Sequence, residues 1–314
     1  MRVLVTGGSG LVGHGMRAVQ HDEFFNHLDF VFVRSKDYNL LEWSQTKSMI
    51  NDIKPDCVIH LAANVGGLFK NMEQKVDMFE HNMRMNMNVV RACHEGNVNQ
   101  FVGMLSTCIF PDKTTYPINE DMLHDGVPHE SNNTYAYAKR MLQVQCEAYR
   151  EQYNRCYKCV IPTNVYGEHD NYSFQDAHVI PALIHRCHMA RETDRPFVVR
   201  GTGEPLRQFV YSRDLAAGVL TILDSLQYIQ ETTVIINGGK FEHSIGAVAM
   251  EIAGLYDYAH RIQFDKSFSD GQHKKTADGT LFATLAPKFE FTPLTVGLER
   301  SVRWFEDHYP NCRI

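Results

Sequence analysis

The chain has 314 residues, 44% of them hydrophobic and 22% charged, with a formal net charge of −6 at pH 7. This composition is typical of a globular protein, and the absence of any basic block in the sequence argues against nucleic acid as a partner. No apolar run approaches the ~20 residues of a membrane span, so we expect no membrane association.

The eight cysteines are scattered along the sequence, which favours reduced thiols in a cytoplasmic protein over a disulfide framework. A glycine-rich loop follows Met1 within a few residues, so we expect no secretory leader. Cys156 and Cys159 form a lone C-x-x-C pair, and the nearby histidines have no recognisable ligand spacing. We therefore expect no metal site.

Short apolar runs alternate with amphipathic stretches through the first half of the sequence. The predicted strands, rich in β-branched and aromatic residues, are 3–6, 30–33, 57–61, 101–105 and 157–161. The predicted helices between them are 11–20, 43–51, 75–95 and 135–153. This alternation predicts an α/β fold with a Rossmann-like, doubly wound parallel sheet.

The rhythm changes after about residue 166, where Gly, His, Pro and Asp cluster. We predict a Rossmann domain over 1–165, to which 209–239 returns as a strand, a helix and a last strand at 234–237. A smaller α/β substrate-binding lobe takes up 166–208 and 240–314. In that lobe we expect a helix near 178–190, a strand at 197–199, and an irregular tail from Asp265 to a helix at 294–309.

The first strand leads into a glycine loop, "TGGSGLVG", which opens the first helix. Gly7, Gly10 and Gly13 have G-x-x-G-x-x-G spacing in the strand–turn–helix context that dinucleotide binding requires. A helix N-terminus in this position offers free N–H groups to a pyrophosphate. The loop residues that we expect at the cofactor are Gly7, Gly8, Ser9, Gly10, Leu11, Val12 and Gly13.

The end of the second strand indicates which dinucleotide binds. NAD-binding proteins place an acid there to hold the ribose hydroxyls, but this chain has Arg34, Ser35 and Lys36. These side chains suit a 2′-phosphate through charge-assisted hydrogen bonds, so we predict NADP(H). The alternative is a solvated basic turn with no role in binding.

Tyr135 and Lys139 have Y-x-x-x-K spacing, which places them on one face of a helix. We expect the lysine ammonium to lower the pKa of the phenol, so that the tyrosine can exchange a proton with a carbonyl oxygen. By itself this spacing is common. Ser106 ends the preceding strand, however, and supplies a hydroxyl for the same oxygen.

The glycine loop, Ser106, Tyr135 and Lys139 together resemble the extended short-chain dehydrogenase/reductase superfamily over nearly the whole chain. The segments "HLAANVGG", "LSTCIFP", "PTNVYGEHDN" and "HVIPALIHR" are similar to the GDP-L-fucose synthase family within it. The resemblance implies an NADPH-dependent enzyme that epimerises GDP-4-keto-6-deoxy-D-mannose at C3 and C5 and then reduces C4. It also implies a cytoplasmic homodimer formed through the helices at 75–95 and 135–153.

The resemblance further assigns roles to residues. Tyr135, Lys139 and Ser106 carry the reduction, and Cys108 and His178 the epimerisations; on an extended segment Ser106 and Cys108 would point to the same side. Further cofactor contacts are Ala62, Ala63, Leu105, Lys139, Pro162, Asn164, Val165 and His178. Substrate contacts are Asn164, Arg186, Arg200, Arg207, Asp270 and Lys275.

One departure concerns Arg200, which stands where the family often has an aromatic residue before a glycine turn. An arginine can stack on a base or pair with phosphate. Two other functions stay open: another nucleotide-sugar epimerase or dehydratase of the superfamily, and a non-catalytic NADP-sensing protein. The second of these would be expected to lack the tyrosine or the lysine.

Overall fold

The computed structural model describes residues 1–223, 225–268, 270 and 272–314, without the side chains of residues 68 and 69. Its main sheet has six parallel strands in the order β10-β5-β4-β3-β1-β2. They are β1 (Arg2–Thr6), β2 (Asp29–Val33), β3 (Cys57–His60), β4 (Gln100–Met104), β5 (Cys156–Pro162) and β10 (Thr233–Ile236). The chain runs outward in both directions from β1, which makes the sheet doubly wound. The predicted fold class is confirmed.

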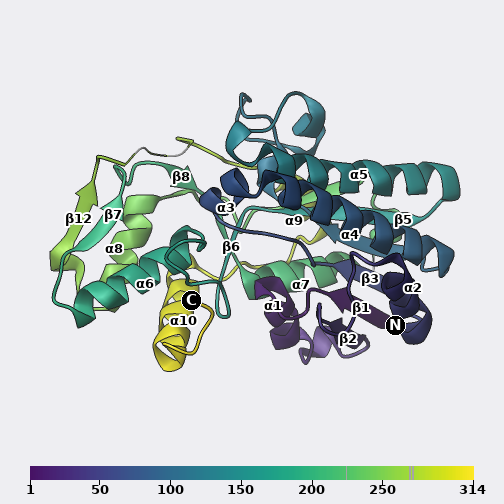
Figure 1. Ribbon diagram of the computed structural model, residues 1–314, viewed down its shortest axis with the longest axis horizontal. Helices are drawn as coiled ribbons and strands as arrows, with labels where there is room; N and C mark the ends of the chain where they lie inside the picture. The colour runs from purple at the N-terminus through teal and green to yellow at the C-terminus, as the bar shows by residue number, and fades with distance from the viewer. Residues whose placement is uncertain (224, 269, 271) are drawn as a thin grey trace.

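Helices cover both faces of this sheet (Figure 1). One face packs against α1 (Leu11–Val19) and α7 (Ser212–Leu223), which also contact each other. The other packs against α2 (Trp43–Ile53), α4 (Lys75–Glu95) and α5 (Asn133–Tyr153).

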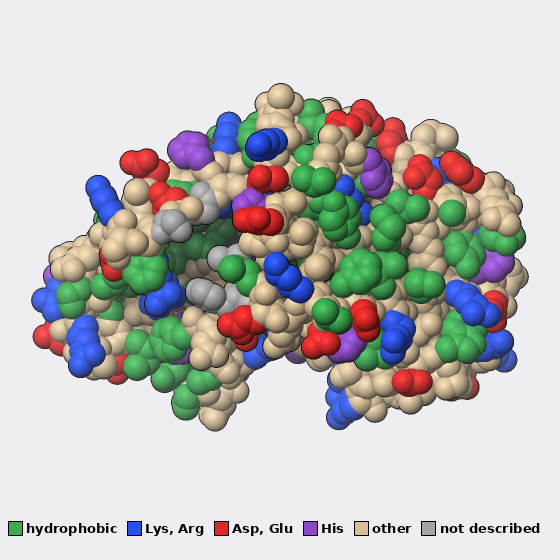
Figure 2. Space-filling model, turned by 45° about the horizontal axis from the view of Figure 1, so that its top comes forward, with side chains coloured by type: hydrophobic (Ala, Val, Ile, Leu, Met, Phe, Trp, Pro, Cys, Tyr) green, Lys and Arg blue, Asp and Glu red, His purple; other side chains and the backbone are tan. Residues whose placement is uncertain are grey.

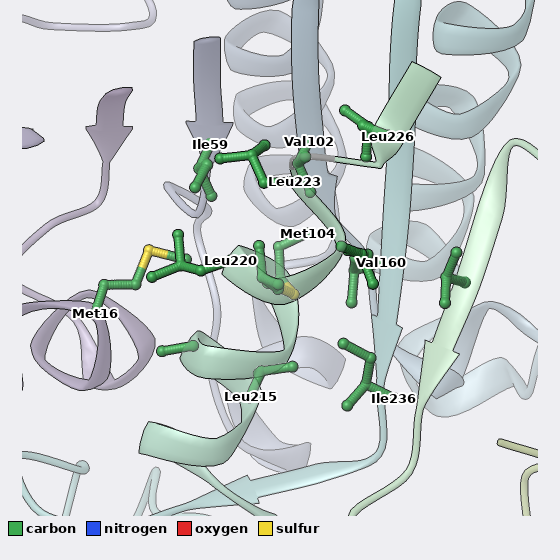
Figure 3. Packing of buried hydrophobic residues seen from close by; sticks show 14 of the residues in the cluster. Met16, Ile59, Val102, Met104, Val160, Leu215, Leu220, Leu223, Leu226 and Ile236 are labelled. Atoms are coloured by element: carbon green, nitrogen blue, oxygen red, sulfur yellow. The ribbon is translucent and has the colours of Figure 1, made fainter. Parts of the chain in front are cut away.

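Side-chain alternation along the strands divides the interior into two clusters. Val3 and Val5 face the α1 and α7 side with Met16, Leu215 and Leu220, whose packing is drawn in Figure 3. Leu4, between the two valines, faces the α4 and α5 side. Burial on both faces explains why these strands are continuous apolar runs.

A second lobe lies at the left of Figure 1 around its own apolar cluster. Its helices are α6 (Val179–Glu192), α8 (Ile245–Leu255) and α10 (Leu294–His308). Its short strands pair as β7 (Phe197–Arg200) with β12 (Ile262–Asp265), and β8 (Leu206–Arg207) with β11 (His243–Ser244). A third pair, β6 (Asn164–Tyr166) with β9 (Phe209–Tyr211), leads from the main sheet toward this lobe.

Three features differ from the sequence prediction. The tail after Asp265 contains a helix that was not predicted, α9 (Thr280–Leu285), which buries Phe282 against the main sheet; the rest of its described residues up to α10 are irregular, as predicted. The helices α8 and α3 (Leu68–Glu73) were not predicted, and β9 pairs with β6 instead of joining the main sheet. Among the described residues, no helix is long and apolar enough to cross a membrane.

Candidate active site

The glycine loop is shaped for close backbone approach at two of its glycines. Gly7 has φ +72°, and a Cβ there would lie 2.7 Å from the Ala62 nitrogen. A Cβ on Gly13 would lie 2.7 Å from the Gly7 carbonyl oxygen. Helix α1 starts directly after Gly10, and no side chain caps its first N–H groups. These groups and the helix dipole can therefore hold a pyrophosphate, so the loop fits a dinucleotide.

Arg34 follows β2 at the position predicted to select the cofactor. Its Nε and Nη2 donate to Asp37 Oδ2 and Oδ1 at 3.0 and 3.2 Å, a forked pairing at the surface. A phosphate offers the same arrangement of acceptors. The Arg34 guanidinium and backbone N–H lower the pKa of Asp37, which keeps its carboxylate charged.

The remaining cofactor candidates gather at the carboxyl edge of the main sheet. Ala62 and Ala63 come just after β3, and Leu105 just after β4. Pro162 ends β5, and Asn164 and Val165 begin β6. Ligands of doubly wound sheets bind at this edge.

Tyr135 and Lys139 lie in the first half of α5, beside the end of β4. Lys139 is buried, and its Nζ donates to the Met104 carbonyl at 2.8 Å and lies 5.9 Å from the Tyr135 ring centroid. Desolvation lowers the pKa of Lys139 to about 8. Burial also raises the pKa of Tyr135, assisted by the Cys108 thiol, so the expected lowering by the lysine is wrong for this state of the protein. The phenol therefore keeps its proton at neutral pH.

A buried hydrogen-bond chain fixes α5 against the sheet beneath the tyrosine. Asn86 Nδ2 donates to the Ala138 carbonyl at 3.3 Å, and Asn86 Oδ1 lies 3.1 Å from His60 Nε2. His60 Nδ1 lies 2.7 Å from Thr6 Oγ1. Because an amide oxygen only accepts, His60 donates from Nε2 and accepts the Thr6 hydroxyl proton at Nδ1. Burial lowers the pKa of His60 to about 3 and keeps the ring neutral.

Ser106 and Cys108 stand at the end of β4, but not on an extended segment. Ser106 is extended, and a single 3-10 turn begins at Thr107, so the predicted alternation of side chains is wrong here. Ser106 Oγ accepts the Cys108 N–H at 3.4 Å and caps this turn. Its hydroxyl can donate a hydrogen bond to the Cys108 side chain, which helps to lower the pKa of that thiol.

Two cavities, which have Asp270 in common, contain most of the remaining site candidates. One of about 270 Å³ is lined by Asn164, His178, Arg200, Arg207 and Asp270 among others. The other, of about 380 Å³, is lined by Cys108, Asp270 and Lys275 together with both apolar and polar side chains. Asp270 borders both, so the predicted epimerisation pair, Cys108 and His178, lies in adjoining compartments.

The predicted substrate-binding residues surround this space unevenly. Asp270 is fixed by Thr202, whose N–H and hydroxyl donate to its two carboxylate oxygens at 2.9 and 2.6 Å. The Arg200 guanidinium lies 4.6 Å from the centre of the Phe268 ring. Arg186 does not line either cavity. Burial lowers its pKa, and the nearby charge of Arg200 lowers it further.

Sequence reasoning missed His129 and Gln272, which line the second cavity, and Asp112, which lies beside both of them. The Nε2 of His129 lies 4.0 Å from Asp112 Oδ1. Gln272 donates to Asp112 Oδ1 at 2.7 Å. They come from loops far apart in the sequence with no shared motif, so only the fold brings them together.

Metal binding has no support among the described side chains, where no group of three or more potential ligands occurs. All eight cysteines are free thiols. Cys156 and Cys159 pack into clusters on opposite faces of the sheet, so they cannot act as a pair.

A doubly wound sheet with a glycine loop, and a Tyr-x-x-x-Lys helix at its carboxyl edge, define a nucleotide-dependent enzyme of the short-chain dehydrogenase/reductase type. The family model described as "NAD dependent epimerase/dehydratase family" matches residues 3–237. The chain belongs to this family, in the branch that contains the GDP-L-fucose synthases.

Individual relatives support this placement. The chain is 46% identical to GDP-L-fucose synthase from Dictyostelium discoideum, covering 99% of this chain and 97% of that one. It is 42% identical to a probable GDP-L-fucose synthase from Drosophila melanogaster, covering 99% of each. A GDP-L-fucose synthetase from Naegleria fowleri, solved bound to NADP, has 40% identity and a TM-score of 0.92, covering 100% of this chain and 95% of that one. The resemblance inferred from the sequence is confirmed.

Proposed function

We propose that this chain converts GDP-4-keto-6-deoxy-D-mannose to GDP-L-fucose, epimerising C3 and C5 and then reducing the C4 ketone with NADPH. The observation that carries the proposal is the convergence of Tyr135, Lys139, Ser106 and Cys108 at the end of β4, next to the cavity that holds His178. The cofactor supplies the hydride. The relatives named GDP-L-fucose synthase support the choice of substrate.

The epimerisations follow from the acidity of protons beside a ketone. Cys108 and His178 border adjoining cavities, so they can approach a sugar ring from different directions. One group takes the C–H proton, and the electron pair moves to the C4 oxygen as an enolate; returning a proton to the opposite face inverts the carbon. Desolvation lowers the pKa of His178, so its neutral ring is ready to accept a proton.

The same oxygen is held by two hydroxyl groups in the reduction. Ser106 accepts the Cys108 N–H and can donate its own proton to the C4 oxygen. Tyr135, with its raised pKa, donates the proton that converts the alkoxide to an alcohol. Lys139 holds a positive charge beside the tyrosine and stabilises the phenolate that forms when Tyr135 gives up its proton.

The nucleotide end of the substrate needs cations for its two phosphates and polar side chains for its base. We assign Arg200, Arg207, Asn164 and Asp270 to it because they line the cavity of about 270 Å³. Arg186 lies close enough to Arg200 for the two charges to repel, so we assign both to the substrate's phosphates, and Lys275 lines the second cavity. Arg34, Ser35 and Lys36 bind the 2′-phosphate of the cofactor. By this division, residues 1–165 and 209–239 form the NADP-binding domain and the rest the substrate-binding lobe.

We also propose that the protein works as a cytoplasmic homodimer. The helices α4 and α5 expose Val76, Phe79, Met87 and Val144, and Figure 2 shows hydrophobic side chains gathered over this region. Two copies that pair these helices would bury them in a four-helix contact. Light scattering on Val76→Glu/Phe79→Glu should give a monomer where the unmodified protein gives a dimer.

The assay is incubation with NADPH and GDP-4-keto-6-deoxy-D-mannose, following nicotinamide absorbance and identifying the product by mass spectrometry and NMR. The proposal expects stoichiometric NADPH oxidation and GDP-L-fucose. A 4-epimerase or dehydratase would leave NADPH unconsumed, and a sensing protein would bind NADPH without turning over.

A further inference from the structure

Lys275 occupies an unusual position for a lysine that serves only the substrate. It lines the same cavity as Cys108, whose walls include Met72, Phe110 and Ile118. Among the described residues, its ammonium has no hydrogen-bond or ion-pair partner. An unpaired ammonium in partly apolar surroundings is costly, so a ligand or a neighbouring anion must compensate it.

The backbone around Lys275 is fixed on both sides. The His273 carbonyl accepts the Leu206 N–H at 2.9 Å, which ties the segment to β8. The Thr276 carbonyl accepts the Ile118 N–H at 2.8 Å, and the Asp278 N–H donates to the Ile118 carbonyl at 2.7 Å. These backbone hydrogen bonds therefore fix the position of Lys275 at the cavity.

The neighbouring lysine gives a natural comparison. Lys274 Nζ pairs with Glu242 Oε2 at 3.1 Å, and Lys274 does not line the cavity. Lys275 lines the cavity instead, and its charge is the largest of those that lower the pKa of Cys108. The thiol in turn favours the charged form of Lys275. Two consecutive lysines thus have different partners.

We propose that Lys275 is a positioning residue for the epimerisation, its ammonium acting as the counter-charge of the Cys108 thiolate. The inference rests on the proposed function and gives this residue a task besides substrate binding. A thiolate takes the C–H proton, so an S–H bond forms as the C–H bond breaks and the electron pair moves to the C4 oxygen. Lys275 neither gives nor takes a proton in this step; it stabilises the anion that starts it.

Other groups around the pair must be considered in any pH dependence. Burial raises the pKa of Cys108, opposing Lys275, and Ser106 and Lys139 lower it. Arg207 lowers and Asp112 raises the pKa of Lys275. The further titratable groups that border the cavity or the thiol include Tyr116, His129, Tyr135, Arg140 and Asp270.

The test measures the thiol itself and needs neither substrate nor NADPH. Iodoacetamide alkylates a thiolate by displacing iodide, so the rate at Cys108 against pH, followed by peptide mass spectrometry, reports its thiolate fraction. Lys275→Met should shift this profile to higher pH and lower the rate at pH 7.5 about ten- to hundredfold, as expected for loss of an adjacent opposite charge. Lys275→Arg should retain the wild-type profile.

Lys274→Met is the matched control and should leave the Cys108 profile unchanged. The half-buried Cys156 and Cys312 are internal references in every sample, and NADPH binding checks the fold; Lys275→Gln replaces the methionine variant if that one does not fold. Overlapping Cys108 profiles for the Lys275 and Lys274 variants would overturn the inference, even if GDP binding weakened. Because no turnover is measured, this result is independent of which sugar the enzyme makes.

Discussion

Gly13→Ala should damage both the stability of the protein and its affinity for NADPH. The new Cβ would lie 2.7 Å from three backbone atoms, the Gly7 oxygen, the Gly8 carbonyl carbon and the Gly8 Cα. Backbone cannot rotate away as a side chain can. Ordinary contact begins at about 3.4 Å, so α1 must move by roughly 0.7 Å relative to the loop.

This movement has two measurable costs. Overpacking of a close-packed interior costs about 1–3 kcal/mol, which corresponds to a Tm lower by about 2–5 °C for a chain of this size. The same shift displaces the N-terminus of α1 from the pyrophosphate, so NADPH affinity should fall about tenfold or more. Thermal unfolding and a fluorescence titration with NADPH measure the two effects.

Two other glycines serve as controls. A Cβ on Gly254, in α8, meets nothing within 4 Å, so Gly254→Ala should leave the Tm and the NADPH affinity unchanged. A Cβ on Gly10 meets only the Gly7 oxygen at 3.4 Å, and its φ of −86° suits alanine. Gly10→Ala should therefore nearly keep the Tm but weaken NADPH binding, because the methyl group stands where the pyrophosphate approaches. If Gly13→Ala matched wild type in both assays, the close packing of α1 on the loop would not be what positions the cofactor.

Further predictions concern the chemistry. Arg34→Ala should weaken NADPH about ten- to hundredfold and NADH far less; equal losses in the two titrations would remove the basis for choosing NADP. Tyr135→Phe should abolish NADPH oxidation with the fold and NADPH binding intact, and near-normal turnover would make this tyrosine a mere helix residue. The rate of reduction should decline above pH 8, because Lys139, with a pKa of about 8, is charged below that pH and loses its proton above it; a rate that is flat to pH 9.5 would argue against a role for its charge. Cys108→Ser should still oxidise some NADPH but release GDP-rhamnose, whereas wild-type yields of GDP-L-fucose would make the thiol a packing residue.

The sequence predicted the main sheet well because its strands are buried on both faces and therefore consistently apolar. The extent of α4 matches the prediction, and that of α5 starts two residues earlier. Helix α9 was missed because six residues are too few to show a helical period, and Phe282 is its one fully buried residue among those described. Short strands such as β8 and β11 have two residues each and carry no periodicity at all.

Some features of the candidate site could likewise be predicted from the sequence, and others depend on the fold. Tyr135, Lys139 and the glycine loop have fixed spacing within one element, so the sequence places them. The direction of the Tyr135 pKa shift could not be predicted, because it depends on how far the fold desolvates the phenol and the nearby lysine. Thr202, which binds Asp270, and Cys108, which lies near Lys275, are far from these residues in the sequence, so only the fold brings them together.

The measurement that tests the proposed function most directly is a single NMR spectrum of the product formed in deuterated water from unlabelled NADPH and GDP-4-keto-6-deoxy-D-mannose. Solvent-derived protons at C3 and C5 and a cofactor-derived hydride at C4 predict GDP-L-fucose with deuterium at C3 and C5 and protium at C4. Protium at C3 and C5 with the starting configuration retained, or deuterium at C4, would contradict the proposed sequence of epimerisation and reduction.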